Sequence, residues 1–364
     1  MTGPLNEAVA EANYVQVTLT DGRVLELPWF WVRDHGHDED SRDPETLQRR
    51  VDTATLDLDL GAGRVELAPN GSHLTVSWSD GGPDTVLDGA WLAALGRDPA
   101  PRTVWSGDLD LPEPADCATL MADGQVLAGW LDDLHRLGFG LIDRVPPTED
   151  GAQQIADRLG YARRTIFGDV WELAADVTGH ADTAYGTAFI GPHTDSTYNH
   201  DAPGYQLFVC AERDGTGGES IVVDGLGLWE RLGEADAGAA DMLSSVVVPG
   251  RYVDEGVDLL AERPAFRLDD QGRFVQVSLN NYDREGFLLP PAQLRSFYEA
   301  WQLALELAAD ESHWIETGLE PGQALLIDNW RVLHARRAYT GRRRFWGCYL
   351  NREDLESTAR VVSR

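Results

Sequence analysis

Residues 325–334 read LLIDNWRVLH. The apolar start of this run is typical of a strand that is buried on both faces, and the run ends with one histidine, His334. Basic residues follow it at 336, 337 and 342–344. A metal-bound histidine needs a pocket, and a buried arginine just beyond it could bind an anionic group there. The run therefore predicts one metal ligand inside a β fold.

A second pattern supplies the partners that His334 would need. Iron(II) enzymes that activate oxygen commonly hold the metal with two histidines and one carboxylate. Residues i and i+2 of a strand point the same way, so His193 and Asp195 can act as a pair. Residues 180–182 and 37–39 offer similar His and Asp neighbours, and a hydrogen-bonded surface histidine is the alternative reading. The small and apolar residues before His193 favour the first pair.

The rest of the chain favours a mainly β fold with helices packed outside it. Periodic apolar residues predict helices over 124–138, 151–160 and 291–309, the last with a stripe of Leu294, Phe297, Tyr298, Trp301 and Leu305. Short apolar runs predict strands over 205–210, 220–223, 274–279, 324–327 and 345–350. No internal repeat is visible.

The sequence patterns also divide the chain into two domains and a linker. Residues 1–95 alternate short strands with turns, including hairpins across Asp21-Gly22 and Asn70-Gly71, and predict a small β-rich domain. Residues 96–118 contain four prolines and predict a linker. Residues 119–364 would form the larger domain.

Composition limits the partners. The chain has 364 residues with 61 acidic and 30 basic side chains, a formal charge of −31. Such a surface repels phosphate backbones and anionic lipid, so we expect neither nucleic acid nor membrane as a partner. It could favour a cationic substrate or mark a salt-tolerant host. Three scattered cysteines and no apolar leader or membrane-length run predict a cytoplasmic protein.

Several longer motifs resemble the γ-butyrobetaine/trimethyllysine dioxygenase family, and its trimethyllysine branch more closely. They include HTDSTY at 193–198, GGES at 217–220, NNYDR at 280–284, IDNWRVLH at 327–334 and GCYLNREDL at 347–355. The opening WVRDH at 31–35 and VDTA at 51–54 are similar to the family's N-terminal domain. The resemblance covers nearly the whole chain.

This resemblance implies a double-stranded β-helix (jelly-roll) catalytic domain with Fe(II) on His193, Asp195 and His334. It places the distal carboxylate of the co-substrate 2-oxoglutarate on Arg343, with Ser220 as a second contact. Strand parity agrees, because Arg343 and Tyr349 share a face whereas Arg342 and Arg344 point the other way. It also implies polar pocket residues at Asn280 and Asn281, without deciding which one points inward.

The implied reaction is hydroxylation of an unactivated C–H bond, in which 2-oxoglutarate is converted to succinate and CO2. The implied substrate is a small quaternary amine. A trimethylammonium group has no hydrogen to donate, so aromatic faces must surround it. The resemblance assigns this role to Phe167, Trp171, Tyr185 and Tyr349. It indicates trimethyllysine first, and γ-butyrobetaine or a trimethylammonio-phosphonate as rivals.

Two further alternatives differ in kind. A catalytically inactive betaine-binding protein is disfavoured by the complete set of ligands and Arg343. A halogenase is disfavoured by Asp195, which fills the ligand position that such enzymes leave open. The oligomeric state stays open, a homodimer included.

The N-terminal domain departs from the family in one respect. Several members hold a structural zinc there, but Gly36, Asp38, Ser41 and Gly82 stand where its cysteines and histidine would be. His35 and His37 remain, and two histidines without a thiolate make a poor structural site. We therefore expect no structural zinc.

Overall fold

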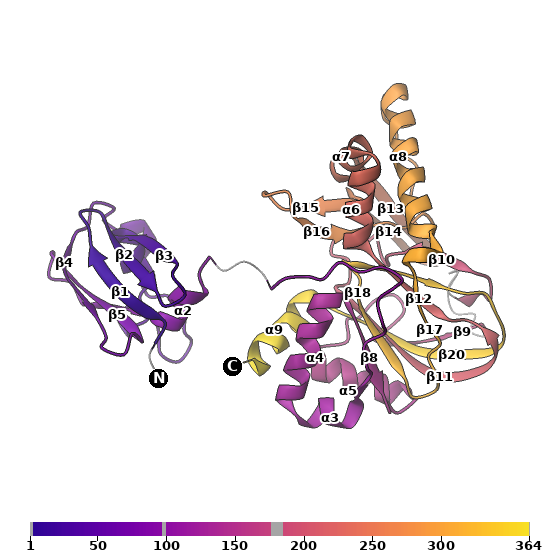
Figure 1. The fold of residues 1–364 in the computed structure, drawn as a ribbon, viewed down its shortest axis with the longest axis horizontal. Coiled ribbons are helices and arrows are strands. Elements are labelled where there is room, and N and C mark those ends of the chain that lie inside the picture. Colours follow the sequence, from indigo (N-terminus) through magenta and orange to yellow (C-terminus); the bar gives the residue numbers. More distant parts are fainter. Residues whose placement is uncertain (1–2, 97–99, 176–184, 364) are drawn as a thin grey trace. The chain divides into compact units, whose positions relative to one another are not determined.

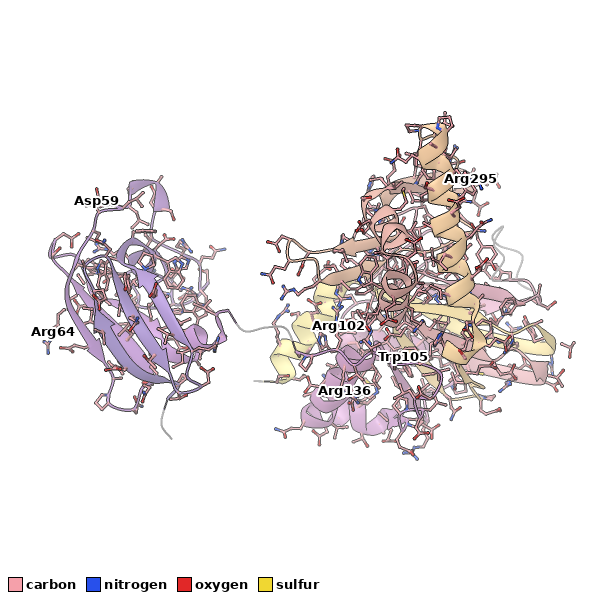
Figure 2. All side chains as sticks on the ribbon, turned by 45° about the horizontal axis from the view of Figure 1, so that its top comes forward. Asp59, Arg64, Arg102, Trp105, Arg136 and Arg295 are labelled. Atoms are coloured by element: carbon pink, nitrogen blue, oxygen red, sulfur yellow. The ribbon has the colours of Figure 1, made fainter. Side chains whose placement is uncertain are left out.

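The computed structural model describes residues 3–96, 100–175 and 185–363. The chain divides into two compact units, Met1–Pro99 and Ala100–Arg364 (Figure 1). The second unit includes most of the segment that the sequence predicts to be a linker. Trp105, labelled in Figure 2, is buried there, and its indole nitrogen donates a 2.6 Å hydrogen bond to the carbonyl oxygen of Leu137.

The first unit contains two three-stranded antiparallel sheets. One is β1-β2-β3, made of Leu5–Ala10, Tyr14–Leu19 and Val24–Pro28, and the other is β4-β5-β6, made of Ala62–Leu67, His73–Trp78 and Thr85–Asp88. Both predicted hairpins are confirmed, with Gly22 (φ +88°) and Gly71 (φ +68°) taking the left-handed conformations that their turns require. Helices α1 (Trp29–Asp34) and α2 (Gly89–Ala94) and a 3-10 turn, Thr53–Thr55, complete the unit.

Asp38 lies in the region where the family's zinc ligands would be. Its carboxylate accepts hydrogen bonds from the backbone of Ser41 (2.9 Å) and Val86 (2.9 Å) and from the Ser41 hydroxyl (3.1 Å). His35 and His37 pack on Trp91. That this unit folds without zinc stays a prediction.

Two sheets form the centre of the second unit. The six-stranded sheet has the order β7-β8-β18-β11-β20-β9, with bounds Ala115–Asp116, Phe139–Asp143, Ala324–Asp328, Tyr205–Gly217, Tyr339–Leu350 and Val170–Ala174. The four-stranded sheet has the order β10-β19-β12-β17, with bounds Ile190–His193, Val332–Arg336, Ser220–Asp224 and Ile315–Thr317. An apolar cluster that joins Val222 and Val332 to Phe139, Ile327 and Phe345 packs the two sheets face to face.

Helices cover the outer face of each sheet (Figure 1). On the six-stranded sheet they are α3 (Cys117–Ala122), α4 (Gly124–Leu137), α5 (Glu149–Leu159) and α9 (Arg352–Val362). On the other they are α6 (Gly225–Ala235), α7 (Ala237–Ser245) and α8 (Pro291–Ala309), beside the pairs β13-β14 (Val247–Asp254, Val257–Pro264) and β15-β16 (Phe266–Leu268, Phe274–Val277). The prediction of a mainly β fold with flanking helices is confirmed.

Strand β11 shows how the sequence builds these layers. Leu207 and Val209 point outward into the helix-covered core, whereas Gln206 and Phe208 point to the space between the sheets. This two-residue alternation is the consequence of strand geometry.

The three predicted helices exist within two residues of their expected bounds. The predicted stripe of α8 is wrong at Tyr298, which is 45% exposed, because Ala300, Ala304 and Ala308 take the buried face beside Phe297 and Trp301. No described helix is both long and apolar enough to cross a membrane.

Candidate metal centre and cavity

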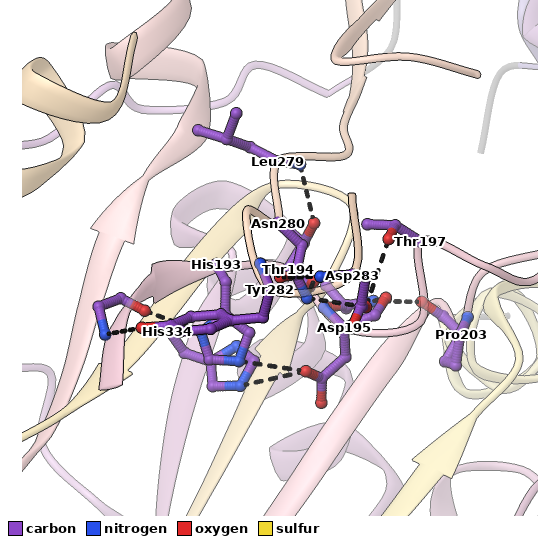
Figure 3. A network of polar contacts seen from close by, with 12 residues as sticks. His193, Thr194, Asp195, Thr197, Pro203, Leu279, Asn280, Tyr282, Asp283 and His334 are labelled. Carbon is purple, nitrogen blue, oxygen red and sulfur yellow. Dashed lines mark hydrogen bonds and ion pairs between the residues drawn. The ribbon is translucent and has the colours of Figure 1, made fainter. Parts of the chain in front are cut away.

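The three predicted metal ligands meet at one end of the four-stranded sheet. His193 ends β10, and His334 lies opposite it in the middle of β19. Their rings are 4.3 Å apart between centroids. Asp195 lies two residues beyond β10 and turns back toward both rings (Figure 3).

The geometry fits a bound metal ion. One carboxylate oxygen of Asp195 lies 3.3 Å from Nε2 of His193 and 3.7 Å from Nε2 of His334. One ligand atom from each residue can be chosen so that all lie within 4.8 Å of one another. Ligands about 2.1 Å from a metal ion and at right angles to each other are about 3 Å apart. Two imidazole nitrogens and a carboxylate oxygen are a donor set suited to non-haem Fe(II).

Hydrogen bonds orient two of these ligands. Nδ1 of His193 lies 2.9 Å from the carbonyl oxygen of Gly191, which leaves Nε2 for the centre. The second oxygen of Asp195 accepts a 2.6 Å hydrogen bond from the Tyr349 hydroxyl. Tyr349 therefore contacts a predicted metal ligand, a contact between β20 and the loop after β10 that the sequence did not reveal.

The environment of two of the three ligands favours the protonation state that a metal needs. Burial and the nearby His193 lower the pKa of His334 to about 4, against the opposite effect of Asp195, so this imidazole is neutral at pH 7. Burial raises the pKa of Asp195, but the two imidazoles and Tyr349 outweigh it and hold the pKa well below its usual range. For His193, the hydrogen bond and charge of Asp195 outweigh burial and raise the pKa. At this imidazole a metal ion therefore competes with a proton more than it does at His334.

One cavity contains this group and most of the other predicted residues. It is lined by the three ligands and by Arg343, Ser220, Phe167, Trp171, Tyr185, Tyr349 and Asn280. Asn281, which the sequence left undecided against Asn280, does not line this cavity. Its side chain is exposed and accepts a 3.1 Å hydrogen bond from the Trp301 indole, because the side chain of Asn280 takes the inner place and binds the backbone of residues 282 and 283.

One end of the cavity is cationic. The Arg343 guanidinium donates a 3.1 Å hydrogen bond to the carbonyl oxygen of Gly218 and lies over the ring of Phe345. Burial, and then Arg336, lower the pKa of Arg343 to about 10, so it stays charged at pH 7. Within the described part of the chain, we find no carboxylate in ion-pair contact with it. By contrast, Arg342 pairs with Glu212 and Asp214 outside the cavity.

The other end is aromatic. The ring centroid of Trp171 lies 4.5 Å from that of Tyr349 and 6.1 Å from that of Phe167. Phe167 also meets Tyr252 at 5.9 Å, and Tyr252 meets Tyr198 at 5.1 Å. This cluster is broader than the sequence predicted.

Several lining residues were missed by sequence reasoning: Tyr198, Gln206, Tyr282, Asp283 and Arg336. Strand parity could have found Arg336, which shares a face with His334. Gln206 reaches the cavity through its pairing with Tyr349 across β11 and β20, which no spacing within one strand reveals. The other three lie in loops, where no parity applies. The alternative pair His180 and Asp182 lies outside the described residues.

Comparisons with known proteins show what this chain is similar to. A family model described as "Taurine catabolism dioxygenase TauD, TfdA family" matches residues 107–349. Human mitochondrial trimethyllysine dioxygenase is 30% identical over 93% of this chain and 83% of its own length. The γ-butyrobetaine dioxygenase of Pseudomonas sp. strain AK-1 is 30% identical over 100% of this chain and 97% of its own. A solved structure, a putative α-ketoglutarate-dependent taurine dioxygenase from Burkholderia xenovorans, is 14% identical, with a TM-score of 0.49 over 66% of this chain and 86% of its own.

These relatives and the clustered His-Asp-His side chains define the class of protein: it is a non-haem dioxygenase that depends on Fe(II) and 2-oxoglutarate. Its place within that class follows from the matching family model, which spans most of the second unit. The chain belongs to the TauD, TfdA family.

Proposed function

We propose that this enzyme hydroxylates a small trimethylammonium substrate, with trimethyllysine first and γ-butyrobetaine second. The observation that carries the proposal is a single cavity with three metal-binding side chains, a buried arginine and a group of aromatic rings. The relatives named as trimethyllysine and γ-butyrobetaine dioxygenases support the choice.

In this proposal His193, Asp195 and His334 hold Fe(II), and Arg343 and Ser220 bind the distal carboxylate of 2-oxoglutarate. Arg343 is suited to this because a planar guanidinium binds a carboxylate with two parallel hydrogen bonds. The bound iron supplies the activation of oxygen. One oxygen atom enters the product as a hydroxyl and the other enters succinate, as CO2 leaves.

The chain's own residues determine what is oxidised. Phe167, Trp171, Tyr185 and Tyr349 present ring faces to the trimethylammonium group, a contact worth about 2 kcal/mol or more when it is desolvated. The Tyr349 hydroxyl also holds Asp195, so this residue would connect the substrate end to the metal. The buried position of Trp171 and Tyr349 excludes water from this end.

Asp283 favours trimethyllysine over γ-butyrobetaine. This carboxylate lines the cavity, and the Asn280 amide (2.9 Å) and Thr197 hydroxyl (3.3 Å) fix its position. Trimethyllysine carries a second cationic group, its α-ammonium, which a carboxylate attracts. γ-Butyrobetaine carries only a carboxylate at that end, which Asp283 repels.

We further propose that the two packed sheets form a double-stranded β-helix, and that residues 1–95 are a separate N-terminal domain. The face-to-face packing of the sheets supports the first proposal. The compact first unit, with its own buried core, supports the second.

A substrate panel tests the function. Purified enzyme with Fe(II), 2-oxoglutarate and oxygen is incubated with trimethyllysine, γ-butyrobetaine, a trimethylammonio-phosphonate or unmethylated lysine, and succinate and hydroxylated product are measured. We expect product from trimethyllysine and none from lysine. Binding of the quaternary amines without metal-dependent succinate would instead indicate an inactive binding protein and overturn the proposal.

A further inference from the structure

The loop that contains Asp195 has an unfavourable backbone conformation, which contacts with other parts of the chain must stabilise. Ser196, the next residue, has φ +59°, in the left-handed region that residues other than glycine seldom occupy. Asp195 itself follows the end of β10, so no strand partner holds its backbone in the sheet. The Tyr349 hydroxyl holds its carboxylate, and its backbone needs a contact from another part of the chain.

The side chain of Asn329 supplies that contact. Its Oδ1 accepts a 2.8 Å hydrogen bond from the backbone N–H of Asp195. Its Nδ2 donates to the carbonyl oxygen of Asp195 and to that of Pro203, each at 3.1 Å. Figure 3 shows how Asp195 and Pro203 lie in this network. Asn329 is 1% exposed, and its amide binds both polar groups of the Asp195 backbone.

Asn329 belongs to the turn that leads into β19, five residues before His334. The turn is fixed on several sides. Its Trp330 indole donates a 3.0 Å hydrogen bond to the carbonyl oxygen of Ala202, and its fully buried Arg331 pairs with Asp224 at 2.9 Å. The same rigid turn therefore determines where the His334 strand starts and where the Asp195 backbone lies.

We propose that Asn329 is a positioning residue for the metal centre: its amide holds the Asp195 backbone so that the carboxylate meets both imidazoles, and thereby raises metal affinity. This rests on the proposed assignment of His193, Asp195 and His334 as the ligands. Residues that orient metal ligands typically change metal affinity by about 10- to 100-fold when they are substituted.

The test compares two variants of one turn. Asn329→Asp keeps the size of the side chain but replaces the donating Nδ2 with an oxygen that faces two carbonyl oxygens. Trp330→Phe removes the hydrogen bond to Ala202 and leaves Asn329 intact. Mn(II) titration of the metal-free proteins gives the dissociation constant, and thermal unfolding of the same samples gives the stability.

We expect Asn329→Asp to weaken Mn(II) binding about 10-fold or more, and Trp330→Phe to leave it near the wild-type value, even where both lower the unfolding temperature. A loss of stability with unchanged Mn(II) affinity in Asn329→Asp would make the role structural and overturn the inference. If that variant does not fold, Asn329→Ser is measured in the same way with the same expectation. Failure of the wild-type protein to bind Mn(II) would instead contradict the ligand assignment.

Discussion

Arg343 and Tyr349 lie on the same face of one strand, β20, six residues apart, yet they end up in opposite chemical environments. At about 3.3 Å per residue they are about 20 Å apart along the strand. Around Arg343 the cavity offers a hydroxyl, Ser220, and a second cation, Arg336. Around Tyr349 it offers the rings of Trp171 and Phe167. The Arg343 end of the strand is thus suited to an anion, and the Tyr349 end is suited to a quaternary ammonium cation.

This difference shows that neighbouring elements, rather than the strand itself, set the chemistry of each end. Gly218 and Ser220 come with β12, whereas Trp171 comes with β9. A substitution at one end of the cavity should therefore impair the function of that end alone. Loss of the metal should impair the function of both ends.

The largest effect is expected at the centre that both ends share. His193→Ala and His334→Ala should each abolish stoichiometric Fe(II) binding and turnover, since each removes one of three proposed ligands. Metal content after anaerobic reconstitution and product formation are the measurements. His180→Ala is the control, and loss of iron in that variant with retention in His193→Ala would mean that the other pair binds the metal.

Arg343→Ala should impair only the anionic end. Losing one side of a buried charge-assisted pair costs about 2–5 kcal/mol, so the 2-oxoglutarate requirement should rise steeply while substrate binding changes little. Steady-state kinetics with varied 2-oxoglutarate measure this. Arg342→Ala, outside the cavity on the same strand, is the matched control. Equal effects of the two variants would contradict the assignment of Arg343 as the residue that binds 2-oxoglutarate.

Trp171→Ala should impair only the aromatic end. It should weaken substrate binding by about 2 kcal/mol, the value of a desolvated cation over an aromatic face, with 2-oxoglutarate binding unchanged. Binding titrations with each ligand separate the two effects. Trp346→Ala removes the same side-chain type from β20 without touching the cavity lining, so it should leave substrate affinity intact. A parallel loss of 2-oxoglutarate binding in Trp171→Ala would contradict the separation of the two ends.

The smallest effect is expected for Asp283→Asn, which keeps the shape of the side chain and removes its charge. An ion pair in a partly exposed site contributes about 1 kcal/mol, so the preference for trimethyllysine over γ-butyrobetaine should fall about fivefold. The ratio of the two kcat/KM values measures it. An unchanged ratio would mean that Asp283 does not take part in substrate recognition.

The sequence predicted the parts of this site that short local patterns carry. The i, i+2 spacing of His193 and Asp195 and the parity of Arg343 and Tyr349 are local, so a single chain displays them. The hairpins at Gly22 and Gly71 were predictable for the same reason, since turn residues determine local backbone conformation.

The site features that the sequence did not predict depend on contacts between residues that are far apart in the chain. The sequence left open which of Asn280 and Asn281 points inward, because the inward position of Asn280 depends on hydrogen bonds with Thr194 and Asp283 and the outward position of Asn281 depends on Trp301. The contact of Tyr349 with Asp195 joins β20 to the loop after β10, and Tyr198 reaches the cavity from a loop. No spacing within a single element predicts such contacts.

The central claim is that the aromatic end binds a positive charge and is more than an apolar pocket. The direct test compares trimethyllysine with its neutral isostere, in which a tert-butyl group replaces trimethylammonium, at saturating 2-oxoglutarate. We expect kcat/KM to fall about 10-fold or more for the neutral compound, since only the cation is attracted by the ring faces. Equal hydroxylation of the two compounds would contradict it and would make these rings a merely apolar surface.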